Sequence, residues 1–178
     1  MIRVLLSGGM DSAVCLAWAY HTLGRPLDCL FVHYGQRHAD QEYAAAIRVG
    51  RVFGVSLWSV PLGLIGGSAL TSETSGQLTG AGVVVPGRNA IMLRQAAATF
   101  AGPAGVEAIV MGACADDHDL FPDCRAAFFD EMREELAPIR IETPLIDLDK
   151  RGVYKLAQRY GGTALLDLTW SCYAGGET

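Results

Sequence analysis

The first residues of the chain join an apolar strand to a glycine-containing loop and a helix, and this arrangement constrains the fold most. The apolar segment Ile2–Leu6 runs directly into the sequence SGGMDS at residues 7–12, and an apolar helix follows. Glycines let a backbone turn tightly and bring its N–H groups against an anion, while the helix start adds free donors and a positive dipole end. The segment therefore predicts a phosphate-binding loop at the carboxyl end of a strand.

The residues of this loop favour one kind of phosphate site. Ser7 and Ser12 supply hydroxyl donors, and Asp11 is a candidate Mg2+ contact or helix cap. The loop lacks the Lys-Ser/Thr ending of a Walker loop and the glycine spacing of the dinucleotide fingerprint. We interpret it as a pyrophosphate-binding loop. The alternative is a glycine-rich turn in which Asp11 or Ser12 only caps the helix.

Length and charge limit the classes of function. A chain of 178 residues with 51% apolar and 19% charged residues predicts a single domain, residues 1–178, with a substantial core. The 14 basic residues are outnumbered by 19 acidic ones, and the formal net charge is −5. A large basic face for nucleic acid is therefore not expected, and chemistry on a small molecule fits better.

The apolar segments and the cysteines predict the compartment. The longest apolar run, Ala13–Tyr20, is far shorter than a membrane-spanning helix requires, and the N-terminus does not resemble a signal peptide. The five cysteines form no CxxC pair and no metal-ligand spacing, and an odd number scattered in this way argues against a disulfide framework. We expect a cytoplasmic protein with no membrane partner.

The first sixty residues alternate between strand and helix patterns. After the first helix, Leu27–Val32 is predicted to be a strand buried on both faces. Residues Ala39–Phe53 have apolar positions at helical spacing, and Val55–Val60 predicts a third strand. With right-handed crossovers this order gives an α/β fold: a doubly wound, mainly parallel sheet with helices on both faces, whose ligand lies beyond the carboxyl ends of the strands.

The segment 62–83 is rich in glycine, serine and threonine and has no clear periodicity. It is too long for a simple connection, so the alternatives are a mobile lid over the site and a disordered excursion. The sequence VPGRN follows, with a helix predicted from about Asn89 to Phe100. Arg88 could hold a phosphate or carboxylate with its fork of donors, or it could be a surface residue beside a capping asparagine.

A polar loop follows the next predicted strand, Ala108–Met111. Residues 112–125 are dense in Asp, His, Cys and Arg and come at the carboxyl end of that strand, which indicates recognition of a polar ligand. The alternative is a solvated loop whose aspartates cap the helix that begins near Arg125. Further on, Phe128–Leu136 is predicted to be a helix and Ile139–Ile141 a short strand, and Asp149 is expected to cap a helix.

Six motifs together resemble one family, in the same order and over nearly the whole chain. The family is 7-cyano-7-deazaguanine synthase, whose members are ATP-pyrophosphatase (PP-loop) enzymes of queuosine biosynthesis. The motifs are SGGMDS (7–12), HYGQRH (33–38), VPGRN (85–89), GACADDHDLFPDCR (112–125), TPL (143–145) and TWSCY (169–173).

The resemblance implies an ATP-dependent ligase reaction. ATP would activate the carboxylate of 7-carboxy-7-deazaguanine as an acyl-adenylate, ammonia would displace AMP to give an amide, and a second ATP would drive dehydration to the nitrile. Such an enzyme must chiefly position ATP, screen its phosphates with Mg2+ and stabilise the developing charge. The resemblance also implies a homodimer.

The motifs carry the family's site residues onto this chain. The ATP loop corresponds to Leu6, Ser7, Gly8, Gly9, Met10, Asp11 and Ser12. Substrate binding is implied for Arg88, Asn89, Asp123, Cys124 and Arg125, and a catalytic role for Asp11, Arg88, Asp123 and Arg125. The sequence does not divide the recognition of the deazaguanine edge and of the acyl group among them.

The sequence departs from the family at its C-terminus. Family members usually have three further cysteines after the one that matches Cys172, and the four hold a structural zinc; the tail at 167–178 has only Cys172. One thiolate cannot form a four-coordinate zinc site. Three interpretations stay open: the protein dispenses with zinc, the sequence is truncated, or a partner chain completes the site.

Three other functions are considered. A diverged relative could activate the same acid and transfer it to another amine, such as one on a protein in an antiviral system. A non-catalytic nucleotide-binding module is disfavoured by the intact loop. A tRNA-thiolating relative is disfavoured because the chain is acidic and has no CxxC pair.

Overall fold

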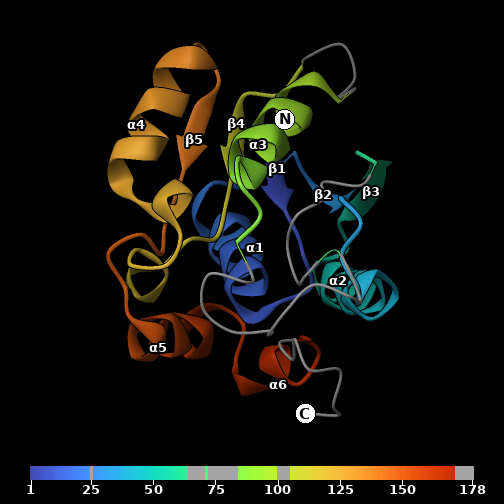
Figure 1. The fold of residues 1–178 in the computed structure, drawn as a ribbon. Coiled ribbons are helices and arrows are strands. Elements are labelled where there is room, and N and C mark those ends of the chain that lie inside the picture. The colour runs from blue at the N-terminus through green and yellow to red at the C-terminus, as the bar shows by residue number, and fades with distance from the viewer. Residues whose placement is uncertain (25, 64–70, 72–83, 100–104, 171–178) are drawn as a thin grey trace.

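Five parallel strands form one sheet at the centre of the molecule (Figure 1). The computed structural model describes residues 1–24, 26–63, 71, 84–99 and 105–170. The strand order is β3-β2-β1-β4-β5. The chain therefore adds β2 and β3 on one side of β1, and then β4 and β5 on the other side. This confirms the predicted doubly wound parallel sheet. The strands are β1 (Ile2–Leu5), β2 (Leu27–His33), β3 (Ser56–Pro61), β4 (Ala108–Val110) and β5 (Arg140–Glu142).

Helices cover both faces of the sheet. On one face, α1 (Met10–Thr22) and α2 (Ala39–Phe53) pack against the sheet, and α5 (Lys150–Tyr160) and α6 (Thr163–Leu166) pack against α1. The other face packs against α3 (Arg88–Ala98) and α4 (Ala126–Glu135), and Figure 1 shows these two helices on the side opposite α5 and α6. Two short 3-10 helices, η2 (Ala115–Asp117) and η3 (Pro122–Cys124), lie in the loop after β4. Throughout the described residues, every helix is too short or too polar to cross a bilayer.

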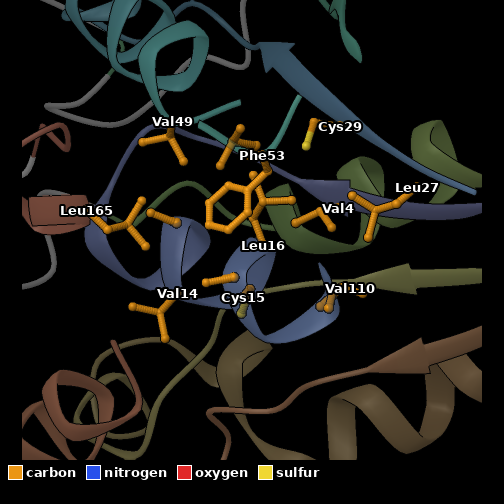
Figure 2. Packing of buried hydrophobic residues seen from close by; sticks show 14 of the residues in the cluster. Val4, Val14, Cys15, Leu16, Leu27, Cys29, Val49, Phe53, Val110 and Leu165 are labelled. Atoms are coloured by element: carbon orange, nitrogen blue, oxygen red, sulfur yellow. The ribbon is translucent and has the colours of Figure 1, made fainter. Parts of the chain in front are cut away.

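The alternation of side chains along each strand divides the core into two layers. Val4 belongs to the layer under α1, α2, α5 and α6, whereas its neighbour Leu5 belongs to the layer under α3 and α4. Figure 2 shows Val4, Leu16 and Phe53 within the first layer. Helix α1 is buried on several sides because it lies between the sheet and other helices, which explains its nearly uniform apolar sequence.

Element boundaries agree closely with the sequence patterns. Helix α2 has the predicted bounds, and the Asp149 carboxylate caps α5 by accepting a hydrogen bond from the Gly152 backbone N–H at 2.7 Å. Strand β3 is shifted by one residue, and α3 ends at Ala98, before the predicted Phe100. Most of the proposed lid at 62–83 lies outside the described residues.

A buried ion pair joins β1 to β2, although both strands were expected to be purely apolar. Arg3 is fully buried and donates to both carboxylate oxygens of Asp28, its register partner, at 3.0 and 2.7 Å. The same guanidinium donates to the carbonyls of Ala96 and Thr99 at the end of α3, at 3.0 and 2.8 Å. The charge pair therefore also satisfies carbonyls at the end of α3 that have no partner within the helix.

We predict that Asp28→Asn destabilises the fold by about 3 to 5 kcal/mol, because it leaves the buried Arg3 guanidinium without a counter-charge. Urea unfolding monitored by circular dichroism would measure the loss. The matched control is Glu135→Gln, which removes the exposed ion pair with Arg94 and should change the unfolding midpoint little. Equal, small effects of the two substitutions would contradict the prediction.

Candidate active site

A cavity of about 610 Å3 opens at the carboxyl ends of the central strands. It is bordered by the loops after β1, β2 and β4 and by the starts of α3 and α5, which is where a doubly wound sheet places its ligand. Several residues predicted from the motifs line it together: Leu6, Ser7, Gly9, Met10, Asp11, Ser12, Arg88, Asn89 and Cys124. Gly8, Asp123 and Arg125 are not among the residues that line it.

Hydrogen bonds of two serine hydroxyls hold the conformation of the loop after β1. The Ser12 hydroxyl accepts from the Ser7 backbone N–H at 3.2 Å and donates to the Gly9 carbonyl at 2.9 Å, and it lies 3.1 Å from the Ser7 hydroxyl. Gly9 is the N-cap of α1, and no side chain caps this helix. The alternative in which Asp11 or Ser12 serves as the cap is therefore wrong. Without a side-chain cap, the first-turn N–H groups of α1 suit an anion.

Gly8 allows α2 to pack directly against the loop. Its φ angle is +84°, and a Cβ atom there would overlap the Glu42 carbonyl and lie 3.0 Å from Ala45 Cβ and from Ala46 N. On the other side, the Gly8 carbonyl accepts a hydrogen bond from the Trp170 backbone N–H at 2.9 Å. A helix and the last described residue of the chain thus fix the conformation of the loop.

Lys150 provides a positive charge that the sequence analysis missed. Its ammonium group lies 2.8 Å from the Asp11 carboxylate, and its backbone N–H donates to Asp116 at 2.8 Å. Burial lowers the pKa of this ammonium, but the hydrogen bond and ion pair with Asp11 outweigh burial, so the net pKa is raised. One signal was available: the predicted cap Asp149 places the next residue at the start of a helix.

The groups around Asp11 fit a divalent cation. One oxygen of Asp11 is buried and has no hydrogen-bond partner, and the ligand atoms of Asp11, Asp117 and Cys114 lie within 4.8 Å of one another. Two carboxylates suit Mg2+, which prefers oxygen ligands. Burial raises the pKa of the Cys114 thiol, so this thiol stays protonated and is not a ligand for Mg2+. The predicted zinc-type residue Cys172 lies outside the described residues.

The start of α3 and the 3-10 helix η3 bring the second and third motifs together. The buried Asn89 side chain donates to the Asp123 carbonyl at 2.9 Å, and its backbone N–H donates to the Asp123 carboxylate at 3.3 Å. Arg88 donates to the Asn89 side-chain oxygen at 3.3 Å and lies over the Tyr34 ring. Asp123 therefore holds the start of α3, while Arg88 and Asn89 face the cavity.

Two other residues of the third motif are placed differently. Burial raises the pKa of the Cys124 thiol to about 12, so this cavity residue is a neutral contact and not a nucleophile. Arg125 is exposed at the start of α4 and donates to the His118 carbonyl at 2.8 Å. The roles proposed for Asp123 and Arg125 stay predictions.

An apolar slot and an acidic group complete the lining. Leu120, Phe121 and Met92 pack against the buried Tyr34 and Val85. A flat, partly aromatic ligand suits such a slot. Glu42 also faces the cavity, and burial raises the pKa of its carboxyl group to about 7.

The fold defines the class of this protein first: a doubly wound α/β protein of the PP-loop type. Two solved structures share the fold. The U34-tRNA thiolase NcsA from Methanococcus maripaludis has a TM-score of 0.60 at 15% identity, over 97% of this chain and 59% of that chain. An NMN synthetase from Francisella tularensis has a TM-score of 0.59 at 19% identity, over 99% of this chain and 69% of that one.

The family follows from sequence. A family model described as queuosine biosynthesis protein QueC matches residues 2–178. The 7-cyano-7-deazaguanine synthase of Hyphomonas neptunium is 37% identical over 97% of this chain and 81% of its own length, and that of Oceanobacillus iheyensis is 39% identical over 98% and 84%. The chain belongs to the QueC family of queuosine biosynthesis, as the motifs predicted.

We predict that Gly8→Ala destabilises the fold by about 3 kcal/mol or more, because the new Cβ meets the backbone of α2 at a φ angle that alanine rarely adopts. Thermal unfolding would measure this. Gly9→Ala is the matched control, since a Cβ there lies 3.5 Å from the nearest atom and the φ angle is −79°. A Gly8→Ala variant as stable as Gly9→Ala would refute the packing argument.

Proposed function

We propose that this protein converts 7-carboxy-7-deazaguanine into 7-cyano-7-deazaguanine with ammonium and two molecules of ATP, through an acyl-adenylate and an amide. One observation supports the proposal above the others: a single cavity joins the uncapped phosphate loop to the Arg88 and Asn89 wall. A nucleotide and an acid bound there would lie next to each other. The names of the sequence relatives supply the product, 7-cyano-7-deazaguanine.

The chain's own groups suit the binding of ATP. The first-turn N–H groups of α1 would hold phosphate oxygens, and the Lys150 ammonium adds positive charge from α5. Asp11 and Asp117 would hold Mg2+, which when bound screens the charge of the phosphates. Lys150 and Mg2+ would thus balance the negative charges of Asp11 and Asp117. ATP would therefore not meet an uncompensated negative surface.

The cavity residues around Arg88 and Asn89 suit the binding of the acid. The slot of Tyr34, Met92 and Phe121 would take the flat deazaguanine ring, and the donors of Arg88 and Asn89 lie beside it. A carboxylate oxygen attacks the α-phosphate, and pyrophosphate leaves. Positive groups that line the cavity would stabilise the charge that develops as the P–O bonds exchange.

Each of the two ATP molecules converts one oxygen of the acid into part of a leaving group, AMP. In the first cycle ammonia forms the C–N bond, and one carboxylate oxygen leaves on AMP. In the second cycle the amide oxygen is adenylated, and its loss as AMP with removal of the N–H protons leaves the nitrile. Both oxygens of the acid therefore depart on AMP, so one adenylation site can serve both steps.

The direct test is a mass-spectrometric assay of the purified chain with 7-carboxy-7-deazaguanine, MgATP and ammonium. We expect the nitrile together with AMP and pyrophosphate. AMP formation that depends on the acid but yields no nitrile would favour the relative that transfers the activated acid to another amine. No acid-dependent consumption of ATP would overturn the proposal.

We predict that Lys150→Met lowers kcat/KM for ATP by about 100-fold, because it removes the ammonium group beside the phosphate loop. Steady-state kinetics at saturating acid would measure the change. Lys155→Met is the matched control, since Lys155 is exposed on the same helix and does not line the cavity. Wild-type kinetics in Lys150→Met would contradict the assigned role of this lysine.

A further inference from the structure

Glu42 is a cavity residue that the steps above do not use. It lies in the first turn of α2, and its backbone carbonyl occupies the space that a Cβ atom at position 8 would need. Its carboxylate accepts a hydrogen bond from the Gln36 side chain at 3.3 Å. Glu42 lines the cavity together with residues of the phosphate loop and with Arg88.

Gln36 holds the carboxylate in place. The Gln36 side-chain oxygen accepts from the Tyr34 backbone N–H at 2.9 Å, and its amide nitrogen donates to the Val32 carbonyl at 3.2 Å as well as to Glu42. Gln36 is buried, and these bonds tie it to the end of β2. Glu42 is therefore an oriented group and not a loose surface acid.

The charged groups that face Glu42 leave it able to accept a proton. Arg88 on α3 is the cation that acts on it, and Gln36 also favours its charged form, but burial outweighs both and raises its pKa to about 7. On its own helix, the neighbouring first-turn acid Asp40 is exposed. Asp11 and Asp117 also line the cavity, where Asp11 pairs with Lys150 and Asp117 accepts from Cys114.

The proposed reaction needs a base. An ammonium ion has no lone pair, so it must lose a proton before its nitrogen can attack the acyl carbon. Among the described residues that line the cavity, Lys150 and Arg88 are cations and the Cys124 thiol is protonated. Glu42 combines a negative charge for binding ammonium with a basicity greater than that of an exposed carboxylate.

We propose that Glu42 binds the ammonium ion and accepts its proton, which makes it the base of the amide-forming step. This inference rests on the proposed function. The carboxylate takes one proton and becomes a carboxylic acid, and the nitrogen lone pair forms the C–N bond. The C–O bond to AMP breaks with its electron pair going to AMP, and the released AMP carries away the second proton lost from nitrogen.

The experiment separates acid activation from ammonia use. Acid-dependent exchange of labelled pyrophosphate into ATP reports adenylation without ammonium. Hydroxylamine, which is mostly neutral near neutral pH, captures the adenylate without a base. In Glu42→Gln we expect kcat/KM for ammonium to fall about 100-fold, while pyrophosphate exchange and hydroxylamine capture stay within about twofold of wild type. Asp40→Asn is the matched control and should behave as wild type.

A pH profile of the wild-type protein tests the same assignment without a substitution. If Glu42 is the base, kcat/KM for total ammonium rises as this carboxyl group ionises and levels off above about pH 7. If the protein instead uses free ammonia from solution, the profile keeps rising into the alkaline range. We expect the first profile, and the second one in Glu42→Gln.

Each result that differs from these expectations would contradict a specific claim. Wild-type use of ammonium by Glu42→Gln, or an alkaline rise in the wild-type profile, would overturn the assignment. Equal losses of pyrophosphate exchange and ammonium use would show that Glu42 positions Arg88 and is not the base. Absence of acid-dependent exchange in the wild-type protein would overturn the proposed function, and the base assignment with it.

Discussion

The close approach of α2 to the loop after β1 is the constraint on which the site depends. Only glycine fits at position 8, because the backbone of α2 occupies the space of a side chain there. This contact brings Glu42 to the phosphate loop, and the Trp170 backbone fixes the same residue from the other side. Loop, helix and C-terminal segment are thus positioned relative to one another by one residue without a Cβ atom.

Local patterns made most of the fold predictable. The apolar periodicity of residues 39–53 defined α2, and the alternation of strands with helices led to a parallel sheet because crossovers have a fixed hand. The cap at Asp149 needed only the residues of the helix start. The phosphate loop was recognisable because its strand, glycines and helix are contiguous in the sequence.

Features made by distant residues were not predictable in this way. Lys150 and Asp11 are 139 positions apart, and only the packed structure shows that their charges meet. Arg3 and Asp28 lie in strands that were expected to be apolar, and only the sheet register shows that they are side by side. Glu42 resembled any exposed acid at the start of a helix, because its burial depends on Gln36 and on the loop.

The placement of charges in the cavity addresses a conflict in the proposed chemistry. ATP needs positive surroundings, whereas ammonium needs a negative group nearby. In the cavity different residues meet these demands: Lys150 and the start of α1 supply positive charge, and Glu42 on α2 supplies the negative group. An ionised carboxylate near phosphates would repel them, but a carboxyl group with a pKa of about 7 is partly neutral at neutral pH. When Glu42 takes a proton from ammonium, both charges disappear together, so the nucleophile forms without leaving an uncompensated charge beside the nucleotide.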